Sequence, residues 1–106
     1  MFDIVSPERA ATLIASGVVV VDVREPSEWE HGHIPGARLM SLATLRTARG
    51  NLKGSVLFVC GRGMRSQTAA RLAVEHGVRS VYSLAGGMNS WINAGLSITT
   101  ELSVAV

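Results

Sequence analysis

The segment at 55–76 constrains the fold most, because it places the only cysteine of the chain between a strand pattern and a helix pattern. The apolar, β-branched run at 56–59 predicts a short strand that is buried on both faces. Cys60 follows this run directly, and the next residues include two glycines that allow sharp backbone turns. From Arg65 the apolar spacing predicts a helix, whose first N–H groups lack partners and point into the turn. These N–H groups would stabilise a thiolate, a persulfide or an oxyanion there.

The loop after Cys60 predicts a nucleophilic cysteine in an anion-binding cradle. Arg62 and Arg65 add two positive charges to this loop, and arginine keeps its proton at any working pH. The alternative is a buried structural thiol, since free cysteine is among the most buried residue types. Two arginines and two glycines within the next five residues favour the nucleophile, because a structural thiol has no use for such surroundings.

Size and charge place further limits on function. The chain has 106 residues with 10 basic and 8 acidic ones, which predicts one domain, 1–106, built around one core. The arginines are scattered and aromatic residues are few, so we expect no nucleic-acid partner. A single cysteine excludes an internal disulfide framework and a C-x-x-C pair, and it suits a reducing, cytoplasmic location. We expect neither a secretory signal nor a membrane span, because no long apolar segment is present.

Strand and helix patterns alternate along the rest of the chain. Strands are expected at 3–5, 18–21, 37–40, 56–59 and 80–84, and helices at 7–16, 26–29, 42–49, 65–76 and 87–94. This alternation predicts an α/β fold with a parallel sheet and helices on both faces. Ligands bind beyond the carboxyl ends of the strands in such sheets. Asp22, Cys60 and the Gly86–Gly87 turn each follow a strand, so all three should lie at that edge.

Two other groups of polar residues have simpler interpretations than catalysis. Asp22 and Arg24 are expected to form a structural ion pair or loop clamp near the site, because charged groups at strand ends usually satisfy buried backbone or each other. His31 and His33 lack a third ligand at useful spacing, so we expect no metal site. The two tryptophans are interpreted as core residues.

Three pieces of sequence, in this order, resemble the rhodanese family. They are D-V-R-E-P-S-E-W-E-H-G-H-I-P-G-A at 22–37, C-G-R-G-M-R-S at 60–66 and G-G-M-N-S-W at 86–91. The first is similar to the family's amino-terminal signature, the second to its active-site loop and the third to its carboxy-terminal signature. The resemblance covers about 4–98. It implies a three-layer α/β sandwich around a five-stranded parallel sheet, and sulfur transfer through a persulfide without a cofactor.

The resemblance also assigns roles within the loop. Cys60 corresponds to the nucleophile and Arg65 to the loop-closing arginine, which makes these two the catalytic residues. The residues that would bind the substrate are Gly61, Arg62, Gly63, Met64 and Ser66. The family implies a small anionic sulfur donor such as thiosulfate. It also implies an acceptor that is cyanide or a thiol, including a sulfur-accepting protein.

The two loop arginines are expected to differ. Many family members have a small residue where this chain has Arg62, which leaves the substrate preference open. Arg65 lies where the loop meets the helix, so we expect its guanidinium to point inward to the donor anion or the loop backbone. Arg62 lies in the middle of the loop between glycines, so we expect it to project to solvent at the mouth of the site.

Two alternatives to sulfur transfer fit parts of the pattern. Phosphatases and arsenate reductases that resemble this fold have five residues between the cysteine and the arginine, whereas this chain has four, from Gly61 to Met64. A shorter loop suits a sulfur atom better than a tetrahedral oxyanion. Rhodanese-like domains also serve as non-catalytic sulfur carriers or as binding modules, and the binding modules have usually lost the cysteine. Cys60 with its full loop argues against that role.

Overall fold

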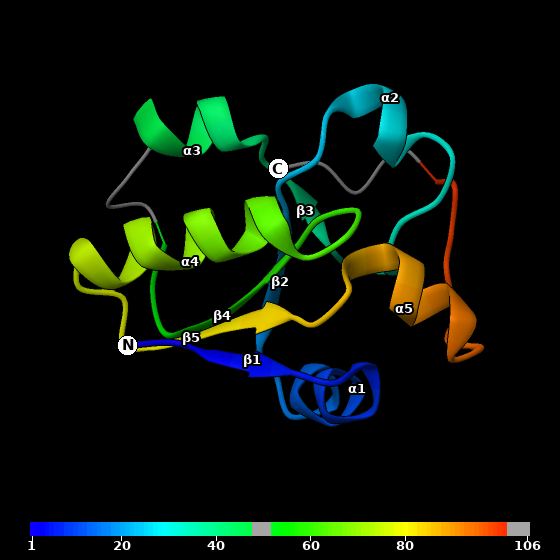
Figure 1. Ribbon diagram of the computed structural model, residues 1–106, viewed down its shortest axis with the longest axis horizontal. Coiled ribbons are helices and arrows are strands. Elements are labelled where there is room, and N and C mark those ends of the chain that lie inside the picture. The colour runs from blue at the N-terminus through cyan, green and yellow to red at the C-terminus, as the bar shows by residue number, and fades with distance from the viewer. Residues whose placement is uncertain (48–51, 102–106) are drawn as a thin grey trace.

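The computed structural model describes residues 1–47 and 52–101 and contains a five-stranded sheet with helices on both faces (Figure 1). The strands are β1 (Asp3–Val5), β2 (Val19–Asp22), β3 (Arg38–Leu39), β4 (Ser55–Val59) and β5 (Ser80–Leu84). Their order is β1-β5-β4-β2-β3, and each neighbouring pair is parallel. The predicted α/β fold with a parallel sheet is therefore confirmed.

The helices begin near the positions that the sequence signals predict. They are α1 (Pro7–Ala15), α2 (Pro26–Trp29), α3 (Leu42–Thr47), α4 (Met64–Glu75) and α5 (Gly87–Asn93). The Ser6 hydroxyl caps α1 by accepting a hydrogen bond from the Arg9 N–H at 3.1 Å. The predicted end of α3 at Arg49 lies outside the described residues. Within the described ranges, no helix combines the length and the apolar character that a membrane span requires.

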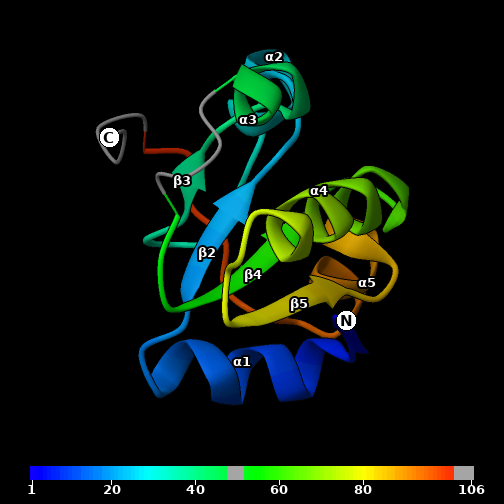
Figure 2. The same ribbon diagram turned by 90° about the vertical axis from the view of Figure 1, so that its left-hand side faces the viewer.

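Successive side chains of β4 point to opposite faces of the sheet, and each set packs into a hydrophobic core on its own face. Leu57 and Val59 pack on the side of α1 and α5, whereas Val56 and Phe58 pack on the side of α3 and α4. Figure 2 shows α1 and α4 on opposite sides of the sheet. Cys60 continues the alternation and joins the core cluster beneath α4. The thiol is therefore placed between the end of β4 and the start of that helix.

Several strand boundaries, in β2, β3 and β4, differ from the sequence prediction by one residue. The run of four valines begins one residue late as a strand, because the Val18 N–H donates to the Leu13 carbonyl at the end of α1. The third strand is predicted at 37–40 but contains only Arg38 and Leu39. It lies at the edge of the sheet and pairs with β2 alone, so few ladder bonds extend it.

The carboxyl ends of the central strands meet at one edge, as predicted. Asp22 pairs in register with Val59, and the Val23 N–H donates to the Val59 carbonyl at 2.9 Å. The Met88 N–H donates to the Cys60 carbonyl at 2.7 Å, which brings the start of α5 to the same place. The residues that follow three strands thus surround the cysteine.

Candidate active site

The Cys60 sulfur lies at the amino-terminal end of α4. The side chain is buried, with 1% of its surface exposed, and Sγ accepts a hydrogen bond from the Gly63 N–H at 3.1 Å. Gly63 has a φ of 100°, a conformation that residues with a Cβ rarely adopt, and it precedes the first residue of α4. The turn and the unpaired N–H groups of the helix therefore direct positive dipole ends toward the sulfur.

Two serines extend this environment behind the sulfur. The Cys60 thiol donates to the Ser66 hydroxyl at 3.5 Å, and the Ser66 and Ser83 hydroxyl oxygens are 2.7 Å apart. Burial alone would raise the pKa of the Cys60 thiol. The Ser66 hydroxyl and the backbone N–H groups of Ser66, Gly63 and Arg62 outweigh burial, so the pKa lies below its ordinary value. The site thus favours the thiolate, which is the nucleophilic form.

The start of α5 supports the loop backbone. The Met88 and Asn89 N–H groups donate to the Cys60 and Gly61 carbonyls at 2.7 and 3.1 Å. A Cβ at Gly87 would lie only 2.3 Å from the Cys60 carbonyl oxygen, so this contact requires glycine. The start of α5 therefore fixes the position of the loop that follows β4.

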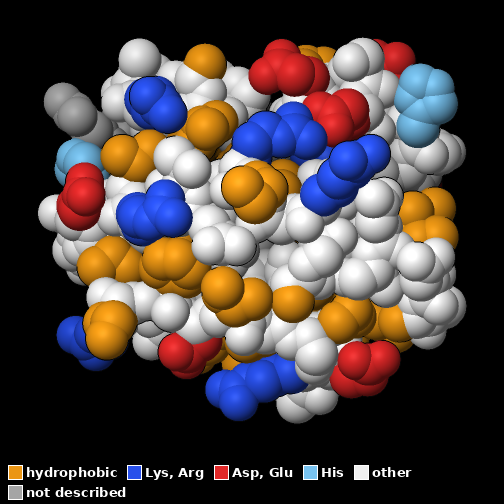
Figure 3. Space-filling model, viewed as in Figure 1, with side chains coloured by type: hydrophobic (Ala, Val, Ile, Leu, Met, Phe, Trp, Pro, Cys, Tyr) orange, Lys and Arg blue, Asp and Glu red, His pale blue; other side chains and the backbone are white. Residues whose placement is uncertain are grey.

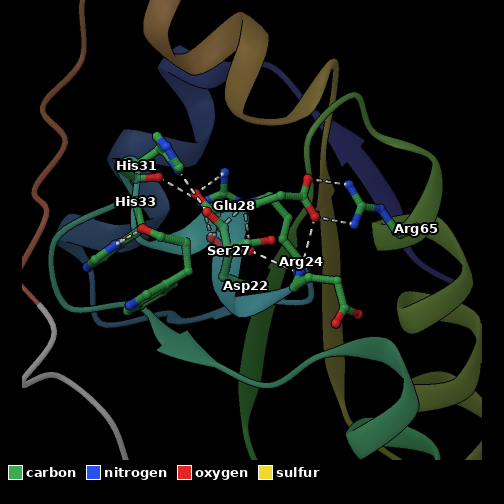
Figure 4. A network of polar contacts seen from close by, with 10 residues as sticks. Asp22, Arg24, Ser27, Glu28, His31, His33 and Arg65 are labelled. Carbon is green, nitrogen blue, oxygen red and sulfur yellow. Dashed lines mark hydrogen bonds and ion pairs between the residues drawn. The ribbon is translucent and has the colours of Figure 1, made fainter.

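The loop arginines are placed differently from each other. Arg62 is exposed, which confirms the predicted projection to solvent, and Met64 beside it is 75% exposed. Arg65 donates from Nη1 and Nη2 to the two carboxylate oxygens of Glu28 on α2, at 2.8 and 2.9 Å (Figure 4). The expectation that its guanidinium points inward is wrong, because Glu28 offers a bidentate partner across the mouth. This pairing raises the pKa of Arg65.

The Glu28 carboxylate carries a full negative charge at the mouth. The hydrogen bonds from Arg65, opposed by burial, lower its pKa from 4.5 to about 2. Figure 3 accordingly shows acidic and basic side chains next to each other around α2 and the start of α4. The mouth of the site therefore carries charges of both signs.

Asp22 and Arg24 form the ion pair that the sequence predicts. The Arg24 Nη2 atom lies 2.8 Å from Asp22 Oδ2, and both side chains are buried. Nη2 also donates to the Gly32 carbonyl at 2.8 Å, and Nε donates to Asp22 Oδ1 at 2.9 Å. The pair clamps the end of β2 to the segment after α2 (Figure 4).

Two neighbouring cavities open at this edge of the sheet. One of about 350 Å³ is lined by Cys60, both loop arginines and Glu28. The other, of about 460 Å³, lies along α2 and α5 and is lined by Arg24 and Ile92. Glu28, Gly61 and Asn89 line both cavities and therefore form the wall between them. The first is the candidate active site, because it alone of these two contacts the thiol.

A family model described as a rhodanese-like domain matches residues 6–94, which include the cysteine loop and the residues around it. The chain belongs to the rhodanese family.

Curated relatives in this family carry the name thiosulfate sulfurtransferase GlpE. The protein from Pseudomonas entomophila is 43% identical over 94 residues, covering 85% of this chain and 84% of the relative. The protein from Pseudoalteromonas translucida is 38% identical over 76 residues, covering 70% and 72%.

Two solved structures of other proteins have the same fold. A Rhodopseudomonas palustris protein of unknown function, described as a possible tyrosine phosphatase, is 30% identical with a TM-score of 0.83, covering 92% of this chain and 85% of its own. The human single-domain sulfurtransferase is 27% identical with a TM-score of 0.77, covering 85% and 95%.

Sequence patterns alone do not single out three residues that the structure places at the candidate active site: Glu28, Ser83 and Asn89. Glu28 lies within the first signature, on a helix of four residues that reaches the same edge as the loop. Ser83 has a detectable signal, because it is a polar residue at an inward position of β5, two residues after the buried Val81. Asn89 follows the glycine pair, and its N–H holds the Gly61 carbonyl.

His31 and His33 do not line the thiol cavity. His33 is fully buried, its ring stacks on Trp29 with centroids 3.4 Å apart, and Nδ1 donates to the Trp29 carbonyl at 2.9 Å. His31 is exposed, and Nδ1 donates to the Ser27 carbonyl at 2.8 Å. Across residues 1–47 and 52–101, no three side chains of the types that bind metals cluster together.

Proposed function

We propose that this rhodanese-family protein is a sulfurtransferase that carries sulfur as a persulfide on Cys60. The observation that carries the proposal is a thiol with a lowered pKa at the start of α4, within a loop that has four residues before Arg65. Sulfurtransferase activity is also the activity in the names of the curated relatives at 43% and 38% identity. We propose thiosulfate or a related anion as the donor.

The reaction proceeds in two displacement steps on sulfur. The Cys60 thiolate attacks the outer sulfur of thiosulfate, a bond forms from Sγ to that sulfur, and sulfite leaves with the electron pair of the broken S–S bond. Cyanide or a thiolate acceptor then attacks the outer sulfur of the persulfide. The Sγ–S bond breaks, and its electron pair returns to Cys60 as the thiolate. Each step balances without a cofactor or a second cysteine.

The residues around Cys60 supply stabilisation of negative charge in both steps. The Gly63 N–H donates to Sγ, and we propose that the remaining N–H groups at the start of α4 stabilise the outer sulfur of the persulfide. The Ser66 hydroxyl can turn to donate to the thiolate while Ser83 donates to Ser66, since the two oxygens are 2.7 Å apart. We propose that Ser83 thereby orients Ser66 toward the sulfur.

We also propose a class of sulfur acceptor and a cellular location for the protein. Met64 and Arg62 are both exposed beside the thiol cavity, and we propose that a thiol on an acceptor protein reaches the persulfide from this side. A free nucleophilic thiol suits a reducing compartment, which supports a cytoplasmic location.

Phosphate-ester hydrolysis is disfavoured by the position of Arg65. A guanidinium that binds a transferred phosphate must direct its fork into the cradle, whereas here the fork is occupied by Glu28. The loop is also one residue shorter than in the phosphatases it resembles. We expect the protein to transfer sulfur from thiosulfate faster than it cleaves an aryl phosphate. Faster cleavage of the phosphate would overturn this order.

Whole-protein mass spectrometry tests the proposal. Treatment with thiosulfate should add one sulfur atom, and cyanide should remove it. Cys60→Ser should take up no sulfur and transfer none, because the chain has no other cysteine. Serine is nearly isosteric with cysteine, so the melting temperature of Cys60→Ser should match that of the wild type. A loss of activity in this variant can then be assigned to the missing thiol and not to unfolding. Full thiosulfate–cyanide activity in Cys60→Ser would contradict the persulfide.

A further inference from the structure

The Glu28–Arg65 pair lies directly over the beginning of the loop. A Cβ placed on Gly61 would be 3.3 Å from Arg65 Nη2 and 3.6 Å from Glu28 Oε2. The pair is joined by two hydrogen bonds of 2.8 and 2.9 Å, yet its side chains remain 39% and 37% exposed. The pair therefore lines the thiol cavity and also contacts solvent, so its charges act on a substrate that enters this cavity.

Two of the three arginine charges near this mouth are matched by carboxylates. Arg65 is matched by Glu28, and Arg24 is held by Asp22 and the Gly32 carbonyl. Arg62 takes part in neither of the two ion pairs found among the described residues and is exposed. A donor anion thus approaches the positive charge of Arg62 and also the negative charge of Glu28. That carboxylate stays ionised throughout the working range, since its pKa is about 2.

We propose that Glu28 sets the charge selectivity of the sulfur-transfer site. By engaging Arg65, it weakens the binding of dianionic sulfur donors relative to donors and acceptors that carry less negative charge. Compared with a site that lacks the Glu28 charge, this mouth therefore favours thiol acceptors and monoanionic donors, such as persulfides of small organic thiols, relative to thiosulfate. The inference rests on the proposed function, and Glu28 acts through Arg65 as a positioning residue.

Alkylation of Cys60 by a charged and a neutral reagent tests the proposal. Iodoacetate and iodoacetamide react with the same thiolate and differ mainly in charge. In Glu28→Gln the ratio of the iodoacetate rate to the iodoacetamide rate should rise about 3- to 10-fold, because one negative charge next to the path is removed. The rise should shrink at high salt, since the pair is partly exposed. A loosened loop would change both rates together and leave the ratio unchanged.

Glu30→Gln is the matched control. It removes one negative charge at the end of the same helix, from an exposed side chain outside both ion pairs. The ratio should stay at the wild-type value in this variant. Arg65→Gln provides the opposite test, because it leaves the Glu28 charge unmatched and should lower the ratio. It also keeps the proposal testable if Glu28→Gln does not fold.

Steady-state kinetics supply a second readout. The KM for thiosulfate should fall in Glu28→Gln, with kcat changed less than KM, and the preference for thiosulfate over a monoanionic thiosulfonate should increase. Unchanged alkylation ratios in both Glu28→Gln and Arg65→Gln would overturn the charge role. Alkylation needs no sulfur transfer, so shifted ratios in a protein that forms no persulfide would instead refute the proposed function alone.

Discussion

Two arginine–carboxylate pairs lie within a few residues of each other at this site, and burial separates their roles. Asp22–Arg24 is enclosed, with side chains 1% and 8% exposed, whereas Glu28–Arg65 is 37% and 39% exposed. The first joins residues two positions apart at the end of β2, and the second joins residues 37 positions apart on α2 and α4. Exposed pairs contribute little to stability, whereas removing one partner of a buried pair is costly. The buried pair therefore contributes to the stability of the fold, whereas the charges of the exposed pair can be changed at little cost in stability.

The buried pair also fixes the position of one member of the exposed pair. Arg24 binds the Gly32 carbonyl and thereby fixes the segment that follows α2 to the end of β2. Glu28 is part of α2, so its position over the loop depends on this clamp. The buried Asp22–Arg24 pair thus holds the Glu28 carboxylate in place at the mouth of the site.

The largest effect is expected from breaking the buried pair. Asp22→Asn keeps the shape of the side chain but leaves the Arg24 charge buried and unmatched, so unfolding free energy should fall by about 3–5 kcal/mol. Denaturant titration measures the loss. The matched control Asp3→Asn changes an exposed aspartate and should stay within about 0.5 kcal/mol of the wild type. If the two variants are equally stable, the buried pair is not the clamp described above.

Replacing each arginine by lysine compares the pairs at constant charge. Arg24 donates from two nitrogens to Asp22 and from one of them to Gly32, which a single ammonium cannot reproduce. Arg24→Lys should therefore destabilise the fold by about 2 kcal/mol, because charge-assisted hydrogen bonds are lost in a buried site. Arg65→Lys should cost about 0.5 kcal/mol or less, since the pair is exposed. Equal losses in thermal or denaturant unfolding would remove the distinction between the pairs.

The residues that sequence reasoning placed correctly are those fixed by local pattern and strand order. Cys60 follows an apolar run, and a parallel sheet brings the ends of such runs to one edge, so its neighbours Asp22 and Gly87 were predictable. The Arg24 clamp was predictable too, because charged groups at strand ends need nearby partners. None of these inferences required knowledge of where a side chain points.

The Glu28–Arg65 pair was not predictable in this way. Both residues belong to segments that lead to the same edge, but the choice of partner for Arg65 depends on side-chain conformations in segments 37 residues apart. The contact of Ser66 with Ser83 has the same origin, since it crosses from α4 to β5. The length of β3 depends on its having a partner on one side only. Each miss concerns tertiary contacts that no local pattern encodes.

The smallest expected effect is the pH dependence of the exposed pair. The pKa of Glu28 is depressed from 4.5 to about 2 in the folded protein, chiefly by Arg65. A group with a depressed folded pKa binds fewer protons when folded, so its contribution to stability is present above the unfolded pKa and is lost as pH falls. The wild type should therefore be more stable than Glu28→Gln by about 1 kcal/mol or less above about pH 5, with the exposure of the pair limiting the size.

That difference should shrink as the pH falls through the window from 4.5 toward about 2, because the carboxylate becomes protonated and loses its attraction to Arg65. Denaturation midpoints of the wild type and Glu28→Gln across this window provide the measurement. Glu30→Gln should show no comparable narrowing, since Glu30 lies outside both ion pairs of the described chain. A gap of constant size down to the acid end would mean that the Glu28→Gln substitution itself disturbs the packing of α2. The ion pair would then contribute nothing measurable to stability, and its function would be confined to the charge that a substrate meets at the mouth.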